Sequence, residues 1–117
     1  MANTFKNATA QKVDSSFVTV YDANAANLTA TVVLGVALCN RTTGTIKVSC
    51  VLRVGGTDGS SNANHRLILN DVQILSGATL EVMGGQKYIL QANDDLQFKS
   101  DTADSLDVVM GVMEITS

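Results

Sequence analysis

The feature that most constrains the fold is a succession of short runs rich in Val, Ile and Thr, separated by Gly, Asn, Asp and Ser. β-Branched residues that alternate with polar ones favour strands, and the separating residues favour tight turns. Roughly eight strands at this close spacing are typical of a sandwich or a jelly roll. We expect strands at residues 17–22, 28–40, 45–52, 65–70, 72–75, 79–83, 87–91, 95–100 and 105–116. The chain is therefore predicted to be all-β, an antiparallel β-sandwich of jelly-roll type.

The length of the chain and its polar beginning indicate the domain organisation. A chain of 117 residues has the size of one domain and can bury a substantial core. Residues 2–13 are polar and carry few strand signals. We therefore expect residues 1–14 to form an N-terminal arm that reaches a neighbouring molecule, and residues 15–117 to form the β-sandwich domain.

Composition argues against several classes of partner. Eight basic side chains stand against eleven acidic ones, and no run of Lys and Arg is present to neutralise a row of phosphates, so we expect no nucleic acid partner. The chain has no stretch of about 18 apolar residues, and its polar start lacks the apolar segment of a signal peptide. We expect neither membrane insertion nor export. The sequence also lacks Pro, a common protector of sheet edges, so short strands, charges or a neighbouring subunit are expected to protect them.

The clearest pairing signal is a predicted hairpin over residues 32–52. A register that sets Val36 opposite Val48 makes every pair on one face apolar. The turn would consist of residues 41–43 followed by Gly44, a form typical of a three-residue loop closed by a left-handed glycine.

This hairpin also predicts the state of the two cysteines. Cys39 and Cys50 would lie on opposite faces and out of register, so their Cα atoms would exceed the roughly 7 Å reach of a disulfide. We expect both to be free thiols, as in a protein that matures in a reducing compartment. Neither has a His or another Cys at ligand spacing, so no zinc site is expected.

The adjacent carboxylates Asp94 and Asp95 are the first candidates for chemistry. Adjacent side chains of an extended strand point to opposite faces, so this pair would not grip one metal ion without a turn. Asn93-Asp94-Asp95 has the composition of a turn whose side chains cap their own backbone, and we expect that role. In the strand that follows, Leu96 and Phe98 are expected in the core, with Gln97 and Lys99 facing out.

The remaining candidates are also expected to be structural. His65 is the only histidine, and no convergent carboxylate or nucleophile is evident from spacing, so we expect an exposed or interface position. The loop at residues 55–61 lacks the Gly-Lys-Ser/Thr ending of a phosphate-binding loop and is expected to be a mobile surface loop. We assign no catalytic, cofactor-binding or metal-binding residue and expect no cofactor.

Two long segments carry a resemblance to a known class of proteins. FVTVYDANAANLTATVVLGVALCNRTTGTIKVSCVLRV resembles the opening of small β-sandwich virion proteins of tailed bacteriophages, with a short strand, an Ala/Asn-rich connector, a long apolar strand, an N-R-T-T-G turn and a return strand. VQILSGATLEVMGGQKYILQANDDLQFKSDTADSLDVVMGVMEIT is similar to their second half. The resemblance covers about residues 15–117 and is one of pattern, without a catalytic signature.

The resemblance implies a non-enzymatic structural protein of the virion, assembled in the host cytoplasm. A head decoration (cement) protein is the first expectation, with partners that include its own copies and the major capsid protein or another virion component. A homo-oligomer is implied, and a trimer is the first guess because cement proteins often occupy threefold positions. The sequence lacks long receptor-binding loops and fibrous repeats, which argues against host recognition.

Three alternatives stay open. The protein could belong to the neck, the tail or a fibre of the virion. A glycan- or receptor-binding module would present exposed aromatic side chains around a concave face, with Tyr88 as a candidate contact. An enzyme would hold His65 in one pocket with Asp94, Asp95 or another carboxylate.

Overall fold

The structure, a computed structural model, describes residues 2–82 and 87–117. Within these residues the chain forms nine strands and two short 3-10 helices, and none of its helices has the length and apolar character needed to span a bilayer. The strands are β1 (Ala2–Val13), β2 (Val18–Asp22), β3 (Leu28–Asn40), β4 (Ile46–Arg53), β5 (His65–Ile74), β6 (Thr79–Glu81), β7 (Tyr88–Gln91), β8 (Asp95–Ser100) and β9 (Leu106–Thr116). The 3-10 helices η1 (Val54–Gly56) and η2 (Ser60–Asn62) lie in the loop between β4 and β5.

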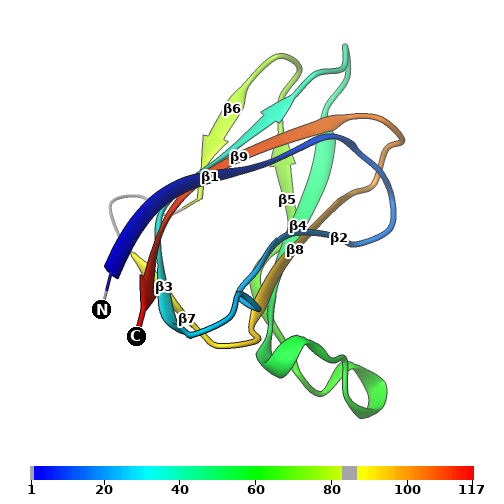
Figure 1. Cartoon of the computed structure of the whole chain (residues 1–117). Coiled ribbons are helices and arrows are strands. Elements are labelled where there is room, and N and C mark those ends of the chain that lie inside the picture. The colour runs from blue at the N-terminus through cyan, green and yellow to red at the C-terminus, as the bar shows by residue number, and fades with distance from the viewer. Residues whose placement is uncertain (1, 83–86) are drawn as a thin grey trace.

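The strands form two antiparallel sheets that face each other (Figure 1). Sheet A has the order β1-β9-β3-β6, and β7 pairs with another part of β3, so β6 and β7 share one edge. Sheet B has the order β2-β8-β4-β5. The first strand thus pairs with the last and the second with the last but one, which is the nested order of a jelly roll. The predicted fold class is confirmed.

The predicted hairpin over residues 32–52 is wrong. β3 pairs with β9, β6 and β7 in sheet A, whereas β4 pairs with β5 and β8 in sheet B. The apolar faces of β3 and β4 do match, but they meet across the core of the sandwich and not side by side within one sheet. Alternation in a sequence marks a buried face without identifying the partner strand.

The two cysteines therefore lie in different sheets, Cys39 on β3 and Cys50 on β4. Both are free, as predicted, although the geometry that led to this prediction does not occur. A bulge between Val33 and Gly35 also shifts the alternation of β3, so that Val33 is buried and Leu34 is turned to solvent.

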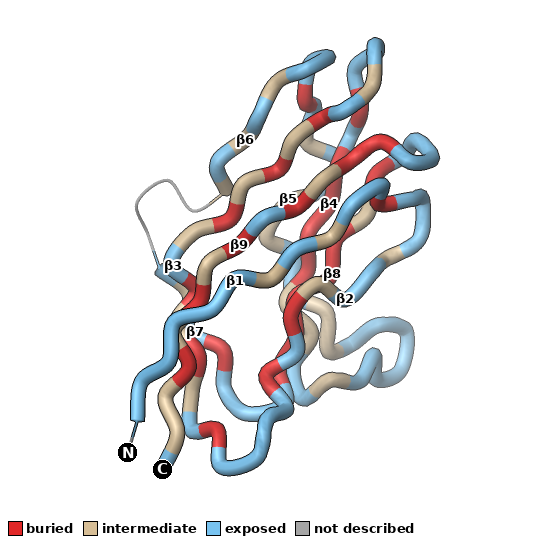
Figure 2. Tube along the Cα trace, turned by 45° about the horizontal axis from the view of Figure 1, so that its top comes forward, coloured by how far each residue is buried: buried red, intermediate tan, exposed pale blue. Residues whose placement is uncertain are grey.

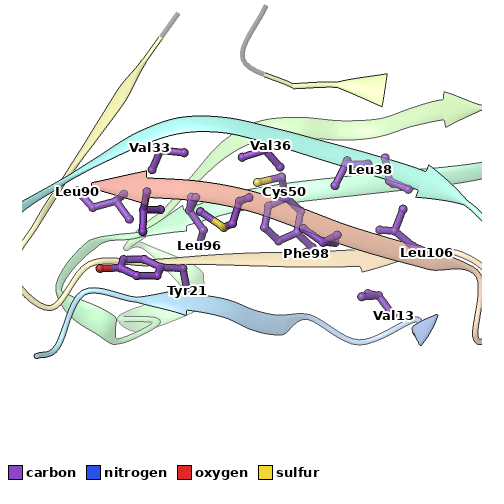
Figure 3. Close-up of a cluster of buried hydrophobic side chains, with 14 of the residues drawn as sticks. Val13, Tyr21, Val33, Val36, Leu38, Cys50, Leu90, Leu96, Phe98 and Leu106 are labelled. Atoms are coloured by element: carbon purple, nitrogen blue, oxygen red, sulfur yellow. The ribbon is translucent and has the colours of Figure 1, made fainter. Parts of the chain in front are cut away.

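The core lies between the two sheets and consists mainly of aliphatic side chains with Phe98 near its centre (Figure 3). Leu96 and Phe98 of β8 are fully buried, as predicted. Each such side chain contributes roughly 1.5–3 kcal/mol through removal of apolar surface from water. The largest fully buried side chains are Phe98, Leu38, Ile46, Leu90, Leu96, Leu106 and Met110.

Most boundaries of the predicted strands lie within one residue of those in the structure, and two of the predicted runs differ further. The runs at residues 65–70 and 72–75 form the single strand β5, because Asp71 adopts a left-handed conformation with φ of 53° and absorbs the irregularity within the strand. The strand predicted at residues 79–83 is described only as β6, Thr79–Glu81. The turn expected at Gly84-Gly85 lies outside the described residues.

The N-terminal segment contains a strand that its polar sequence did not indicate. β1 pairs with β9 from Ala2–Thr116 to Val13–Leu106, and most of its residues are exposed (Figure 2). Backbone hydrogen bonds to β9 supply this pairing, and they do not depend on apolar side chains. A strand that is apolar on both faces is either central or covered by a partner, and β9 is central, between β1 and β3.

Candidate functional site

Asp94 closes the turn before β8, as the sequence predicted. Its Oδ2 accepts a hydrogen bond from the backbone N–H of Gln91 at 3.0 Å, and its Oδ1 accepts one from the N–H of Gly55 at 3.0 Å. The side chain therefore connects the turn to η1 as well as stabilising it. Gly56 of η1 also packs closely against this turn. A Cβ at this position would lie 2.8 Å from the carbonyl oxygen of Asn93, and the φ of 73° at Gly56 also favours glycine.

Asp95 has a different role, which the sequence did not indicate. Its side chain is fully buried, and its Oδ2 accepts hydrogen bonds from Arg53, at 2.7 Å from Nη2 and 3.1 Å from Nε. Its Oδ1 is buried without a hydrogen-bond partner among the described residues. The turn composition that accounts for Asp94 therefore does not account for its neighbour.

Arg53 is the centre of a charged row that crosses sheet B. The register sets Asp22, Asp95, Arg53 and His65 side by side on the four neighbouring strands. Arg53 Nη1 also donates to Asp58 Oδ1 at 3.0 Å, and the hydrogen bonds to Asp95 and then Asp58 raise the pKa of the guanidinium. Burial, and then the charge of Asp95, raise the pKa of Asp22. This row fastens the loop between β4 and β5 to the sheet.

His65 is hydrogen-bonded to Asp58, not to Asp94 or Asp95. Its Nε2 lies 2.8 Å from Asp58 Oδ1, and hydrogen bonds from His65 and then Arg53 lower the pKa of Asp58. The imidazole packs edge-on against Phe17 with ring centroids 5.8 Å apart, and Lys99 Nζ lies 4.8 Å from the Phe17 centroid. Most of the histidine side chain is covered by these contacts.

A hollow of about 320 Å³ on the outer face of sheet B adjoins His65. Its lining residues are Phe17, Ser49, Val51, Asn62, His65, Leu67, Asn70 and Lys99. Ser49 Oγ exchanges hydrogen bonds with Asp71, accepting from its N–H at 3.1 Å and donating to its Oδ1 at 3.4 Å. The Ser49 hydroxyl thus stabilises the bulge of β5. In the described part of the chain no three His, Cys, Asp or Glu side chains are placed to hold a metal ion.

A second polar cluster connects the two sheets beside the core. The Tyr21 hydroxyl donates to Glu114 Oε2 at 2.6 Å and shares a hydrogen bond of 2.8 Å with Thr31 Oγ1. Lys6 Nζ lies 2.9 Å from Glu114 Oε1, so an ion pair holds β1 against β9. The hydrogen bonds from Tyr21 and then Lys6 lower the pKa of Glu114, while burial and then the bond to Glu114 raise the pKa of Tyr21 to about 12.

No element of the described part of the chain covers the outer face of sheet A. We call a row of residues paired side by side across its strands a rung. One rung is apolar throughout and consists of Phe5, Met113, Val32 and Ile89. Phe5 is 71% exposed and Ile89 is 57% exposed. Isolated exposed apolar side chains are ordinary, but a continuous group of them marks a contact surface.

The neighbouring rungs extend this face without charge. On one side lies the rung of Asn3, Ile115, Ala30 and Gln91, and on the other the rung of Asn7, Gly111 and Gly35. Carboxylates appear only in the two rungs beyond the glycines, where Glu81 pairs with Ala37 and Asp107 pairs with Cys39. The outer face of sheet A therefore has an uncharged end that contains the apolar rung and an opposite end that carries carboxylates.

Sequence reasoning found half of this face. The sequence of β9 is apolar on both faces, which fits a central strand or one covered by a partner, and the second face, Val109, Met113 and Ile115, points away from the core. The contribution of Phe5 was missed because it lies in a polar segment that was expected to be an arm. Of the aromatic side chains considered for a sugar platform, Tyr21 and Phe98 are buried, and Tyr88 is half-buried.

Comparison with known proteins shows the fold. No protein-family model and no curated protein matches the chain. Among solved structures, the pilus protein of Bacillus endospore appendages matches with a TM-score of 0.56, 13% identity, and coverage of 98% of this chain and 89% of that one. A chain of the capsid of Helicobacter pylori bacteriophage KHP30 matches with a TM-score of 0.52, 13% identity, and coverage of 100% and 90%.

A third similar structure belongs to a larger protein. A chain of the T13 particle of infectious bursal disease virus matches with a TM-score of 0.55 and 10% identity over 97% of this chain. This chain spans 31% of the length of that protein. At such identities the likeness establishes a shared jelly-roll architecture, which viral capsid chains and a bacterial pilus protein both use.

Proposed function

We propose that the protein is a non-enzymatic structural component of a bacteriophage virion, and that it acts as a capsid decoration (cement) protein. The observation that carries this proposal is the uncharged, apolar outer face of sheet A on a jelly-roll framework. The likeness to chains of a bacteriophage capsid and of the infectious bursal disease virus particle supports it.

Adhesion through buried surface is the proposed mechanism. A standard contact buries about 800 Å² on each partner, and repetition by symmetry turns a modest contact into a stable clamp on a shell. The proposed partners are other copies of this chain and the major capsid protein or another virion component. The polar groups of sheet B, centred on Arg53, serve the fold in this account, because their hydrogen bonds are directed to one another.

The assembly is proposed to be a homo-oligomer, with a trimer as the expectation from the resemblance to cement proteins. The arm role expected for residues 1–14 remains part of the proposal, in a changed form. β1 is an edge strand of twelve residues, and the backbone groups on its side away from β9 are available to a neighbour. Because Val13 is buried and Lys6 pairs with Glu114, deletion of β1 would also weaken the fold.

A binding experiment tests the decoration role. Purified protein is added to capsids that lack it, and the bound fraction is measured by sedimentation and gel densitometry. We expect saturable binding that increases the resistance of the capsid to heat or chelators. Leu75→Lys is the matched control for variants on the outer face of sheet A, since Leu75 is 66% exposed and follows β5 outside that sheet. Protein that ignores capsids but binds tail tubes would move the assignment to the tail.

A filament subunit is the second candidate, and the likeness to the endospore pilus protein favours it. That match covers nearly the whole of both chains, and a long edge strand such as β1 suits addition of a neighbouring strand. Negative-stain microscopy of concentrated protein distinguishes the two roles. Regular filaments without added capsid would support the fibre role, whereas discrete particles that bind capsids would support decoration.

A further inference from the structure

We propose that the outer face of sheet A pairs with the same face of a second copy of this chain, and that Phe5 of each copy sits on the Gly35–Gly111 rung of the other. This inference rests on the proposed structural role and identifies the surface and its occupant. It replaces the trimer expected from the resemblance to cement proteins with a two-fold contact.

The charge distribution makes this face compatible with itself. The chain carries a formal net charge of −3, so two copies repel each other at long range. A two-fold contact also places a charge near its own counterpart wherever that charge lies close to the axis. Three adjacent rungs of the face, which contain Ile115, Met113 and Gly111, carry no ionisable side chain, and the carboxylates of Glu81 and Asp107 lie beyond them at the other end. The contact therefore avoids the repulsion that would oppose pairing elsewhere on the molecule.

The size of the face suits a stable dimer. The eleven residues of β9, at about 3.4 Å each, and four strand positions about 4.8 Å apart give a flat footprint of roughly 700 Å². A standard interface buries about 800 Å² on each partner, with an apolar centre and a polar rim. The outer face of sheet A approaches this area when its polar end is included, and the apolar rung lies within it.

The face carries a projecting side chain beside a rung that lacks side chains at Gly35 and Gly111, and we call this bare rung the recess. Gly35 and Gly111 are paired side by side, and a Cβ built on either glycine would meet nothing within 4 Å. Crowding inside the chain therefore does not explain why both positions lack a side chain. Phe5, on the adjacent rung, is the most exposed large apolar side chain among the described residues. The recess and the projection lie next to each other on one surface.

This adjacency favours a second copy over a different partner. A two-fold axis parallel to the sheet places the Phe5 ring of each copy over the glycine rung of the other, so both recesses are filled at once. An aromatic ring in a fully covered recess is the kind of contact that dominates interface affinity. A shell protein would have to supply its own projecting side chain to fill the recess. Nothing in this chain requires a partner of that kind.

Two variants and a control test the pairing. Gly111→Val fills the recess with a residue that suits strands, and the open space around it predicts an intact fold. Phe5→Lys removes the projection and places a charge in the contact. Sedimentation velocity over a concentration series measures dimer dissociation, and far-UV circular dichroism with thermal melting checks the fold. We expect each variant to weaken dimerisation about tenfold or more, and Leu75→Lys to leave it unchanged.

The outcomes separate this inference from the proposed function. A protein that stays monomeric at high concentration, or a trimer whose dissociation is unchanged by both variants, would overturn the two-fold contact. If the monomer still binds capsids and both variants abolish that binding, the face belongs to a shell partner and the decoration role stands. If the protein dimerises through this face but never binds capsids, the inference holds and the decoration role fails.

Discussion

Replacement of Arg53 by Met should lower the free energy of unfolding by about 3–5 kcal/mol, because it leaves the buried carboxylate of Asp95 without a counter-charge. Met keeps much of the apolar stem of Arg and thus limits the loss of packing. Both hydrogen bonds to Asp95 Oδ2 come from Arg53. The other oxygen has no hydrogen-bond partner among the described residues, so no second donor is in place to compensate.

The two partners differ in exposure, and this difference predicts an asymmetry. The Asp95 side chain is 0% exposed, whereas that of Arg53 is 20% exposed and keeps its hydrogen bond to Asp58. Removal of the carboxylate charge by Asp95→Asn leaves a cation that water and Asp58 still solvate. We therefore expect Asp95→Asn to cost only about 1–2 kcal/mol. For a domain with roughly 5–15 kcal/mol of stability, this difference is readily measured.

Urea unfolding followed by far-UV circular dichroism provides the assay for the wild type, both single variants and the double variant. The double variant Arg53→Met/Asp95→Asn should be more stable than Arg53→Met alone, because it removes the unpaired buried charge. A cost below about 1 kcal/mol for Arg53→Met would refute the reasoning. Strict additivity of the two single changes would refute it as well, because it would mean that the two residues do not interact.

Three further predictions follow from other contacts. The lowered pKa of Glu114 adds stability above about pH 4.5 that is lost as pH falls through the folded value, and the raised pKa of Tyr21 removes stability between about pH 10 and 12. Tyr21→Phe should weaken the dependence of the free energy of unfolding on pH in both ranges. An unchanged pH dependence would contradict the role given to the hydrogen bond between Tyr21 and Glu114. Burial raises the pKa of Cys50 to about 12, so only Cys39 should react rapidly with a thiol reagent in native protein. Rapid reaction of two thiols per chain in the native protein would contradict this prediction. Asp94→Ala, which removes two hydrogen bonds to backbone N–H groups, should cost about 2–3 kcal/mol in urea unfolding and more than Asp94→Asn, which keeps one acceptor.

The strands were predictable because their buried faces alternate, and their pairing was not. β8 occurs at the predicted residues, with Leu96 and Phe98 in the core. The apolar complementarity of β3 and β4 was also real, but it arises across the core, and a sequence does not distinguish that contact from pairing within a sheet. Connectivity in a jelly roll depends on pairings distant in sequence, such as β1 with β9.

The candidate site was predictable only where local chemistry decides it. Asp94 caps its own turn, which residue type and neighbours indicate. Asp95 depends on Arg53, forty-two positions earlier in the chain, and this partner is determined by the register of β4 and β8. Phe5 joins the apolar rung through the pairing of β1 with β9, which its polar neighbours did not suggest.

Hydroxyl-radical footprinting of the assembled and the dissociated protein tests the central claim most directly. Met113 lies on the outer face of sheet A beside Phe5, whereas Met110 lies in the core of the same strand and provides an internal reference. Mass spectrometry measures the oxidation of each side chain. The account predicts that assembly strongly protects Phe5 and Met113, while Met110 is unreactive in both states. Equal oxidation of Phe5 and Met113 before and after assembly would contradict the claim that this face is the contact surface.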